Sequence, residues 1–158
     1  MRVAILTVSD SVACGEREDL SGPLLVERCR QLGWKVTAVL QCSDDPEEIR
    51  SQLHTVADSG LSDLLLTTGG TGLGPRDTTP EATTDVADRV IPGIAEEIRR
   101  KGAEKTPTAV LSRGVAVIRH KTMIINLPGS PKGATESLEA VAHLLAHAVE
   151  VLRGAHHD

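Results

Sequence analysis

An apolar run that leads through a glycine-rich turn into a helix start constrains the fold of this chain more than any other feature. The run LLLT at residues 64–67 is apolar enough to form a strand buried on both faces of a sheet. The stretch TTGGTGLGPRDTTPEA, residues 67–82, begins where that strand ends, and its glycines allow positive φ and close approach of the backbone to a ligand. Thr79, Pro80 and Glu81 then predict a helix, with Thr79 as N-cap, proline at the first helical position and an acid in the first turn.

The rest of the chain continues this alternation of strands and helices. Periodicity and end signals predict further strands at residues 2–8 and 35–40, and helices at residues 20–32, from Asp45 onward, 80–90, 94–101 and roughly 132–152. Strands at residues 115–118 and 123–126 are too close together for a parallel crossover, so we expect an antiparallel hairpin. Residues 1–158 are therefore expected to form one three-layer α/β/α domain with a mostly parallel sheet and an antiparallel hairpin.

Three further helix starts depend on particular side chains. Ser21 is the expected cap of the helix at residues 20–32. Asp45 is the expected cap of the next helix, in a pattern that resembles a capping box with Glu48. Ser130 precedes the last helix, and we expect it either to cap that helix or to contact a ligand.

Composition excludes several classes of function. The net charge of −5 provides no basic face, and with no Phe, no Tyr and only Trp34 the chain offers no aromatic surface for stacking bases, so we expect no nucleic-acid partner. No segment has the length of a membrane span and the N-terminal residues lack the form of a signal peptide, so we expect no membrane partner and a cytoplasmic location. Cys14, Cys29 and Cys42 form no CxxC pair, and their odd number argues against a disulfide framework.

The loops after the first three predicted strands should meet at one edge of the sheet. They begin at residues 9–10, 41–45 and 68–77, and ligands of such sheets bind beyond the carboxyl ends of parallel strands. Arg76 and Asp77 add a cation and a potential metal ligand beside the glycine turn, whose glycine spacing matches neither a P-loop nor a dinucleotide fingerprint. We expect a phosphate-and-metal site here; the alternative is a flexible connection between strand and helix.

Four sequence words, in this order along nearly the whole chain, carry a family resemblance. They are LTVSD with EDLSGP (residues 6–10 and 18–23), the glycine-rich stretch, TPTAVLSR (106–113) and NLPGSPK (126–132). Together they resemble the MoaB/Mog family of molybdopterin-binding proteins, which makes molybdenum cofactor. The resemblance implies a homotrimer, contact with other proteins of that pathway, and transfer of AMP from ATP to the terminal phosphate of molybdopterin, with Mg²⁺ as cofactor and pyrophosphate as the leaving group.

The resemblance also implies roles for individual residues. Asp77 matches the Asp of the family's Arg-Asp pair, and Asp44 is the second catalytic and metal-binding carboxylate; Asp45 is the alternative if the register slips by one. Ser43 stands where the family more commonly has Pro, a departure that bears on catalysis rather than on ligand binding. The implied substrate-binding residues are Thr7, Ser9, Asp10, Thr68, Gly69, Gly70, Thr71, Gly72, Arg76, Ser112, Arg113, Pro128, Gly129, Ser130 and Lys132.

Three other functions compete with the adenylyltransferase. The first is a protein that binds molybdopterin or its precursor without adenylylation. The second is a related domain that cleaves other phosphate compounds and occurs in larger, competence-associated proteins. The third is a purely structural trimer subunit, which would leave the glycine turn and the Arg-Asp pair unexplained. Among the histidines, His143 and His147 lack a third ligand at metal-site spacing, and His156 and His157 are expected in a frayed tail.

Overall fold

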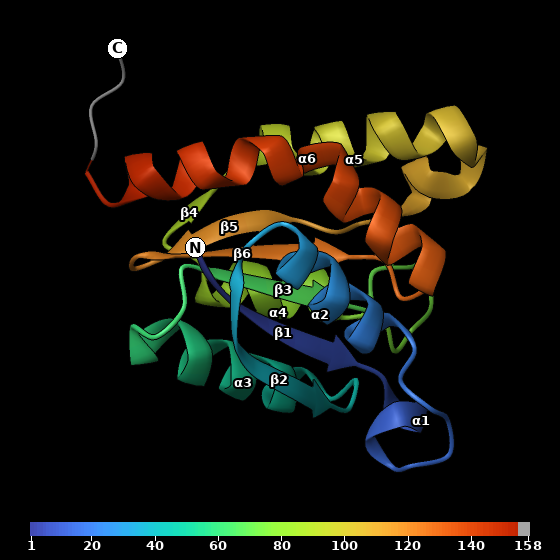
Figure 1. Ribbon diagram of the computed structural model, residues 1–158. Coiled ribbons are helices and arrows are strands. Elements are labelled where there is room, and N and C mark those ends of the chain that lie inside the picture. Colours follow the sequence, from blue (N-terminus) through green and yellow to red (C-terminus); the bar gives the residue numbers. More distant parts are fainter. Residues whose placement is uncertain (155–158) are drawn as a thin grey trace.

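The computed structural model describes residues 1–154, in which strands and helices alternate (Figure 1). The elements are β1 (Arg2–Val8), α1 (Asp10–Ala13), α2 (Ser21–Gln31), β2 (Lys35–Cys42), α3 (Pro46–Ser59), β3 (Leu64–Thr68), α4 (Thr79–Val86), β4 (Arg89–Val90), α5 (Pro92–Lys105), the 3₁₀ helix η1 (Pro107–Leu111), β5 (Ala116–Arg119), β6 (Thr122–Leu127) and α6 (Pro131–Leu152). His156 and His157, expected in a frayed tail, lie outside the described residues. None of the described helices combines the length and the apolar character needed to cross a bilayer.

Within residues 1–154, six strands form one mixed sheet in the order β2-β1-β3-β6-β5-β4. The strands β2, β1, β3 and β6 run parallel to their neighbours in this group, whereas β5 runs antiparallel to both β6 and β4. Only His120 and Lys121 separate β5 from β6, and a connection this short permits only antiparallel pairing. The predicted mostly parallel sheet with an antiparallel hairpin is therefore confirmed.

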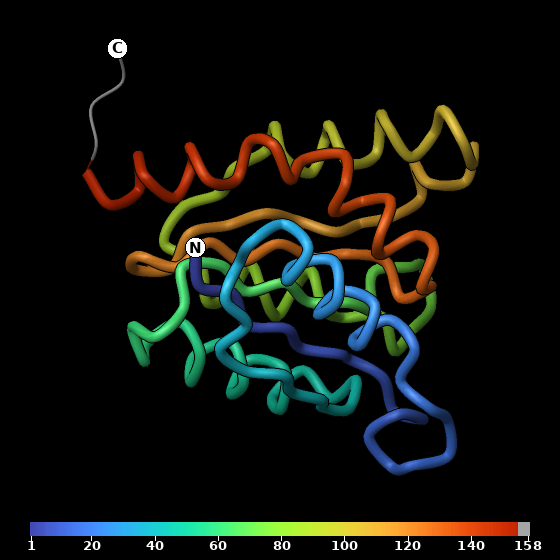
Figure 2. The backbone as a smooth tube through the Cα atoms, in the orientation of Figure 1, coloured from blue at the N-terminus to red at the C-terminus, as the bar shows by residue number. Residues whose placement is uncertain are grey.

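The two faces of the sheet pack into two separate hydrophobic cores. On β1, Val3 and Ile5 enter one core, and Ala4 and Leu6 enter the other, as the alternation of side chains along a strand requires. Helices α2, α5 and α6 cover the first face, and α3 and α4 cover the second. Figure 2 shows α5 and α6 side by side on one face, with α3 on the opposite face. Burial of each Leu, Ile or Val stabilises the fold by about 1.5–3 kcal/mol, and the three predicted layers are confirmed.

The helix predicted at residues 80–90 is too long. Helix α4 ends at Val86, and residues 89–90 form β4, which pairs with β5. Just beyond, the Ile91 N–H donates to the carbonyl of Ala116 at 2.8 Å. Residues 89–90 form backbone hydrogen bonds with the free edge of β5 instead of continuing the helix. Such a tertiary contact overrides local helix propensity.

The expected cap of α2 is also wrong. Ser21 lies inside the helix, and its hydroxyl donates to the carbonyl of Gly129 at 2.7 Å, in the loop before α6. The carboxylate of Asp19 accepts the free N–H of Gly22 at 2.9 Å instead. The Ser21 hydroxyl therefore connects the first turn of α2 to a loop that is far away in sequence.

Thr79 differs from its predicted role in the same way. Helix α4 begins at Thr79, and Thr78 at the cap position makes no capping bond through its side chain. The fully buried Thr79 hydroxyl donates to the carbonyl of Gly69 at 2.9 Å. It thereby fastens the start of α4 to the glycine turn.

The cap predicted for α3 is confirmed, and of the two roles expected for Ser130 the structure shows the cap of α6. Asp45 accepts the N–H two residues ahead at 3.2 Å, and Ser130 accepts the N–H three residues ahead at 3.0 Å. The capping box of α3 is altered, because the carboxylate of Glu48 accepts from the N–H and hydroxyl of Ser43 rather than from the N–H of Asp45.

A buried carboxylate ties both ends of the described chain to the sheet. The side chain of Asp63, just before β3, is 3% exposed. It accepts from the Arg2 N–H at 2.8 Å, from the Arg2 guanidinium at 3.0 Å and from the Arg153 guanidinium after α6. Burial acts to raise the pKa of Asp63, but these hydrogen bonds and charges outweigh it and lower the pKa to about 2.

Folding stability should therefore fall as the pH drops through the acid range. The pKa of Asp63 is about 2 in the folded state against an ordinary value of 3.8, so the unfolded state binds more protons between these values. The carboxylate stabilises the fold above about pH 4, and this contribution of about 1–2 kcal/mol, reduced by the exposure of both arginines, is lost toward pH 2. Urea unfolding at pH 6 and pH 3 tests this, with Asp63→Asn as comparison. If both proteins lose the same stability on acidification, Asp63 is not the responsible group.

Candidate functional site

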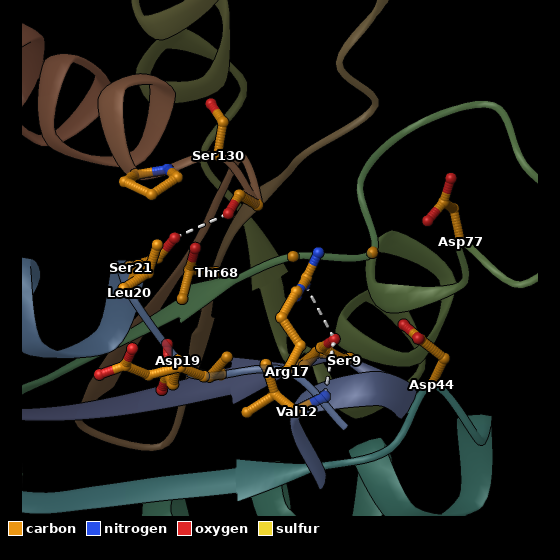
Figure 3. Close-up of a pocket in the computed structure, with 17 residues that line it drawn as sticks. Ser9, Val12, Arg17, Asp19, Leu20, Ser21, Asp44, Thr68, Asp77 and Ser130 are labelled. Atoms are coloured by element: carbon orange, nitrogen blue, oxygen red, sulfur yellow. Dashed lines mark hydrogen bonds between the residues drawn. The ribbon is translucent and has the colours of Figure 1, made fainter. Parts of the chain in front are cut away.

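The carboxyl ends of β1, β2, β3 and β6 border one cavity of about 540 Å³ (Figure 3). The expected convergence of the loops after the first three strands is therefore confirmed, and the segment before α6 joins them. The predicted site residues that line this cavity are Thr7, Ser9, Asp44, Thr68, Gly69, Gly70, Asp77, Gly129 and Ser130.

The other predicted substrate-binding residues lie outside this lining. A neighbouring cavity of about 260 Å³, between α5, η1 and the start of α6, is lined in part by Ser112, Pro128 and Lys132 and shares Ser130 with the first. Neither of these two cavities is lined by Asp10, Thr71, Gly72, Arg76 or Arg113.

Sequence reasoning missed a group of lining residues between the end of β1 and the start of α2. The EDLSGP word marked part of this segment, but no local pattern assigned its side chains to a site. The missed residues are Val8, Val12, Arg17, Glu18, Asp19, Leu20, Ser21 and, at the start of α6, Pro131.

The turn after β3 requires glycine at two positions. Gly69 has φ of 104°, and a Cβ there would lie 2.2 Å from the carbonyl oxygen of Val8. Gly70 has φ of 69°, and a Cβ there would lie 2.2 Å from the Thr79 hydroxyl oxygen. The backbone at the end of β3 thus packs closely against β1 and α4. This close packing holds Gly69 and Gly70 in place in the cavity lining.

Gly69→Ala should lower the free energy of unfolding by at least about 2 kcal/mol, because it combines a strained φ with a clash against backbone. Gly93→Ala is the matched control, since no atom lies within 4 Å of its Cβ position and its φ is not positive. Chemical denaturation of both variants measures the difference. Equal stability of Gly69→Ala and wild type would show that the turn relaxes at little cost.

Arg113 supports the glycine-rich loop from the segment before β5. Its backbone N–H donates to the carbonyl of Thr71 at 2.9 Å. Its guanidinium donates to the carbonyls of Gly72 at 2.9 Å and Asp77 at 2.5 Å, and pairs with Glu81. Each of the three guanidinium nitrogens therefore already has a partner within the protein.

Asp10 and Asp44 hold each other through reciprocal hydrogen bonds. The Asp10 N–H donates to the Asp44 carboxylate at 3.0 Å, and the Asp44 N–H donates to the Asp10 carboxylate at 2.9 Å. Arg76 donates two bonds to the Asp10 carboxylate, at 3.1 and 2.8 Å. These bonds join the loops after β1, β2 and β3 and occupy the bidentate face of Arg76.

The electrostatic surroundings of the acidic residues differ. Burial, together with the charges of Asp10 and Asp77, raises the pKa of Asp44. Hydrogen bonds, first from Arg76 and then from the Asp44 backbone, lower the pKa of Asp10. Asp77 accepts the Gly74 N–H at 2.9 Å and lies on the same side of the cavity as Asp44 (Figure 3).

The carboxylates of this arrangement could hold a divalent cation. Among residues 1–154, no three His, Cys, Asp or Glu side chains form a group that could hold a metal by themselves. Mg²⁺ needs no such cage, because one or two carboxylates, substrate phosphates and waters complete its coordination. The raised pKa of Asp44 reflects burial and nearby negative charge that a divalent cation would offset. Asp44 and Asp77 are the residues that would hold the ion.

The N-terminus of α6 borders the cavity at Ser130 and Pro131. The dipole of this 22-residue helix favours negative charge there. The Thr68 hydroxyl donates to the carbonyl of Pro128 at 2.7 Å and holds the preceding loop on β3. The Lys132 side chain is 80% exposed, 4.0 Å from Glu136.

Comparison with known proteins agrees with this geometry. A family model described as a probable molybdopterin binding domain matches residues 4–147. The chain belongs to the molybdopterin-binding domain family. The predicted resemblance to MoaB and Mog proteins is thereby confirmed.

Relatives in this family differ in length. The molybdenum cofactor biosynthesis bifunctional protein of Chlorobaculum tepidum is 38% identical over 156 residues, which are 99% of this chain and 50% of that protein. The chain thus spans about half the length of this curated relative. The molybdopterin adenylyltransferase of Helicobacter pylori is 37% identical, and the match covers 98% of this chain and 89% of that protein. The molybdopterin biosynthesis enzyme MoaB of Thermus thermophilus superimposes with a TM-score of 0.92 at 51% identity, covering 98% of this chain and 97% of that one.

Proposed function

We propose that this chain transfers AMP from Mg-ATP to the terminal phosphate of molybdopterin and releases pyrophosphate. One observation carries the proposal: Asp44 and Asp77 line the same cavity as the glycine turn and the N-terminus of α6. Carboxylates that could hold a metal and a helix N-terminus that favours anions thus border a common space. The name molybdopterin adenylyltransferase, borne by a relative of similar length, supports the same activity.

In the proposed reaction the chain positions its substrates and forms no covalent bond with them. An oxygen of the molybdopterin phosphate attacks the α-phosphorus of ATP, the bond to the bridging oxygen breaks, and pyrophosphate leaves with the electron pair. Nucleotidyl transfer of this kind depends on alignment and charge neutralisation. Asp44 and Asp77 are the residues that would hold Mg²⁺, and the ion would supply that neutralisation. The N-terminus of α6, which borders the cavity, would favour the phosphate groups through the helix dipole.

The serine that replaces the commoner proline of the family does not disturb this arrangement. The Ser43 hydroxyl accepts the Asp45 N–H at 3.2 Å, and Ser43 donates to the Glu48 carboxylate. These bonds fix the loop before α3 in place of a proline ring, and Asp44 still lines the cavity. The retained Asp44 therefore favours the enzyme over a protein that only binds molybdopterin, and Ser43 does not count against it.

The proposed setting is a homotrimer in the cytoplasm that works with other molybdenum cofactor biosynthesis proteins. The family resemblance supports the trimer, and the free thiols of Cys14, Cys29 and Cys42 suit a reducing compartment. Light scattering coupled to size exclusion measures the trimer directly; a monomer at micromolar concentration would contradict it.

A product assay tests the activity. Purified protein is mixed with molybdopterin, ATP and Mg²⁺, and adenylylated molybdopterin and pyrophosphate are measured, with a metal-free reaction beside it. We expect both products in equal amounts, and only with metal. Tight molybdopterin binding without either product would instead identify a binding protein.

A further inference from the structure

Arg17 is the only Lys or Arg among the described residues that line the cavity at the carboxyl ends of the parallel strands (the main cavity). It lies on the exposed loop between α1 and α2, and its side chain extends from that loop into the cavity toward the end of β3 (Figure 3). The same lining contains four acidic residues, Glu18, Asp19, Asp44 and Asp77. Because acidic side chains outnumber basic ones in this lining, Arg17 is the one positively charged lining side chain that can bind an anionic substrate.

The charge of Arg17 is not neutralised within the described part of the chain. Its guanidinium donates to the Ser9 hydroxyl at 3.2 Å, and among residues 1–154 no carboxylate forms an ion pair with it. The nearby Asp19 carboxylate is occupied by other donors, namely the Thr7 hydroxyl at 2.7 Å, the Gly22 N–H at 2.9 Å and the Gln41 amide at 3.2 Å.

The two arginines that the family resemblance implied as substrate contacts are bound differently. Arg76 donates two hydrogen bonds to Asp10, so its bidentate face is occupied. Arg113 uses all three guanidinium nitrogens on the glycine-rich loop and Glu81. To reach a ligand, either arginine would have to abandon contacts that hold the loops in place, whereas Arg17 has only a neutral hydroxyl to release.

We propose that Arg17 binds a phosphate group of the substrate, while Arg76 and Arg113 hold the loops that shape the site. This inference rests on the proposed function and goes beyond it by assigning the phosphate contact to a residue outside the predicted set. A guanidinium offers two parallel N–H donors that match the oxygens of a phosphate group. Both the triphosphate of ATP and the terminal phosphate of molybdopterin have this chemistry.

Binding measurements on Arg17→Gln test the inference and identify which phosphate is bound. Dissociation constants are measured by titration calorimetry for Mg-ATP and for molybdopterin separately. Arg30→Gln is the matched control, because it removes the same charge from an exposed position on α2 that does not line the main cavity. Loss of a hydrogen bond to a charged group should raise the dissociation constant of at least one ligand roughly 10- to 100-fold, with Arg30→Gln within about twofold of wild type for both.

The outcomes separate this inference from the proposed function. Weaker binding of Mg-ATP alone assigns Arg17 to a phosphate of the nucleotide, and weaker binding of molybdopterin alone assigns it to the pterin phosphate. Weaker binding of both ligands supports a contact where the phosphates of the two substrates meet. If wild-type protein binds both ligands and Arg17→Gln binds them equally well, or if Arg30→Gln is weakened as much, the inference is overturned and the proposed function stands. If wild-type protein binds neither ligand, both fail.

Discussion

Replacing Asp77 with Asn should leave the protein folded and lower its turnover about 10²- to 10³-fold. The Asn carbonyl can still accept the Gly74 N–H, which Asp77 accepts at 2.9 Å, so the turn after the glycines keeps its shape. The variant loses a negative charge in the cavity that also contains Asp44. Loss of one preorganised electrostatic group in an active site raises the barrier by about 2.7–4 kcal/mol, which corresponds to this range of rates.

Initial rates of pyrophosphate release at saturating substrates and Mg²⁺ measure this effect. Asp85→Asn is the control, since it removes an exposed carboxylate from α4 that does not line the cavity. Thermal unfolding of both variants checks that the fold persists. Unchanged turnover in Asp77→Asn would remove Asp77 from the mechanism, and an equal loss in Asp85→Asn would point to a general effect of charge.

The layered fold is accessible from the sequence because it depends on local patterns. The alternating cores of β1 and the fully buried β3 follow directly from their apolar residues. Helix α1, with four residues, and strand β4, with two exposed residues, were not predicted, since elements this short show no periodicity. The caps assigned to Ser21 and Thr79 fail for a related reason: each hydroxyl bonds a carbonyl from another part of the chain.

In the site, too, features that depend on local sequence were predicted, whereas contacts between residues far apart in sequence were not. The sheet edge at which the loops meet follows from topology, and Asp44, Asp77 and the glycine turn indeed line one cavity. The sequence cannot show which arginines are already engaged by the protein, because the partners of Arg76 and Arg113 lie 66 and 32 residues away, at Asp10 and Glu81. An arginine beside a glycine turn therefore resembles a ligand contact until its partners are known.

Asp44→Asn should lower turnover far more than Asp45→Asn, although the two carboxylates are adjacent in sequence. Asp44 lines the cavity, whereas Asp45 is outside its lining and caps α3. Asn caps a helix about as well as Asp, so Asp45→Asn should change stability by less than about 0.5 kcal/mol and leave turnover within about twofold of wild type. Asp44→Asn keeps an acceptor for the Asp10 N–H but removes the charge, so we expect a loss of about 10²-fold.

Stability and activity should also move in opposite directions at Asp44. Burial and the charges of Asp10 and Asp77 raise the pKa of Asp44, so its ionised form opposes folding at neutral pH. The neutral Asn removes this unfavourable charge, and Asp44→Asn should therefore be at least as stable as wild type while it loses activity, as expected where function maintains a destabilising group. Parallel rate and unfolding measurements on the two variants decide the register. If Asp45→Asn is the slower enzyme, Asp45 rather than Asp44 is the catalytic carboxylate, and its side chain does not cap α3 during the reaction.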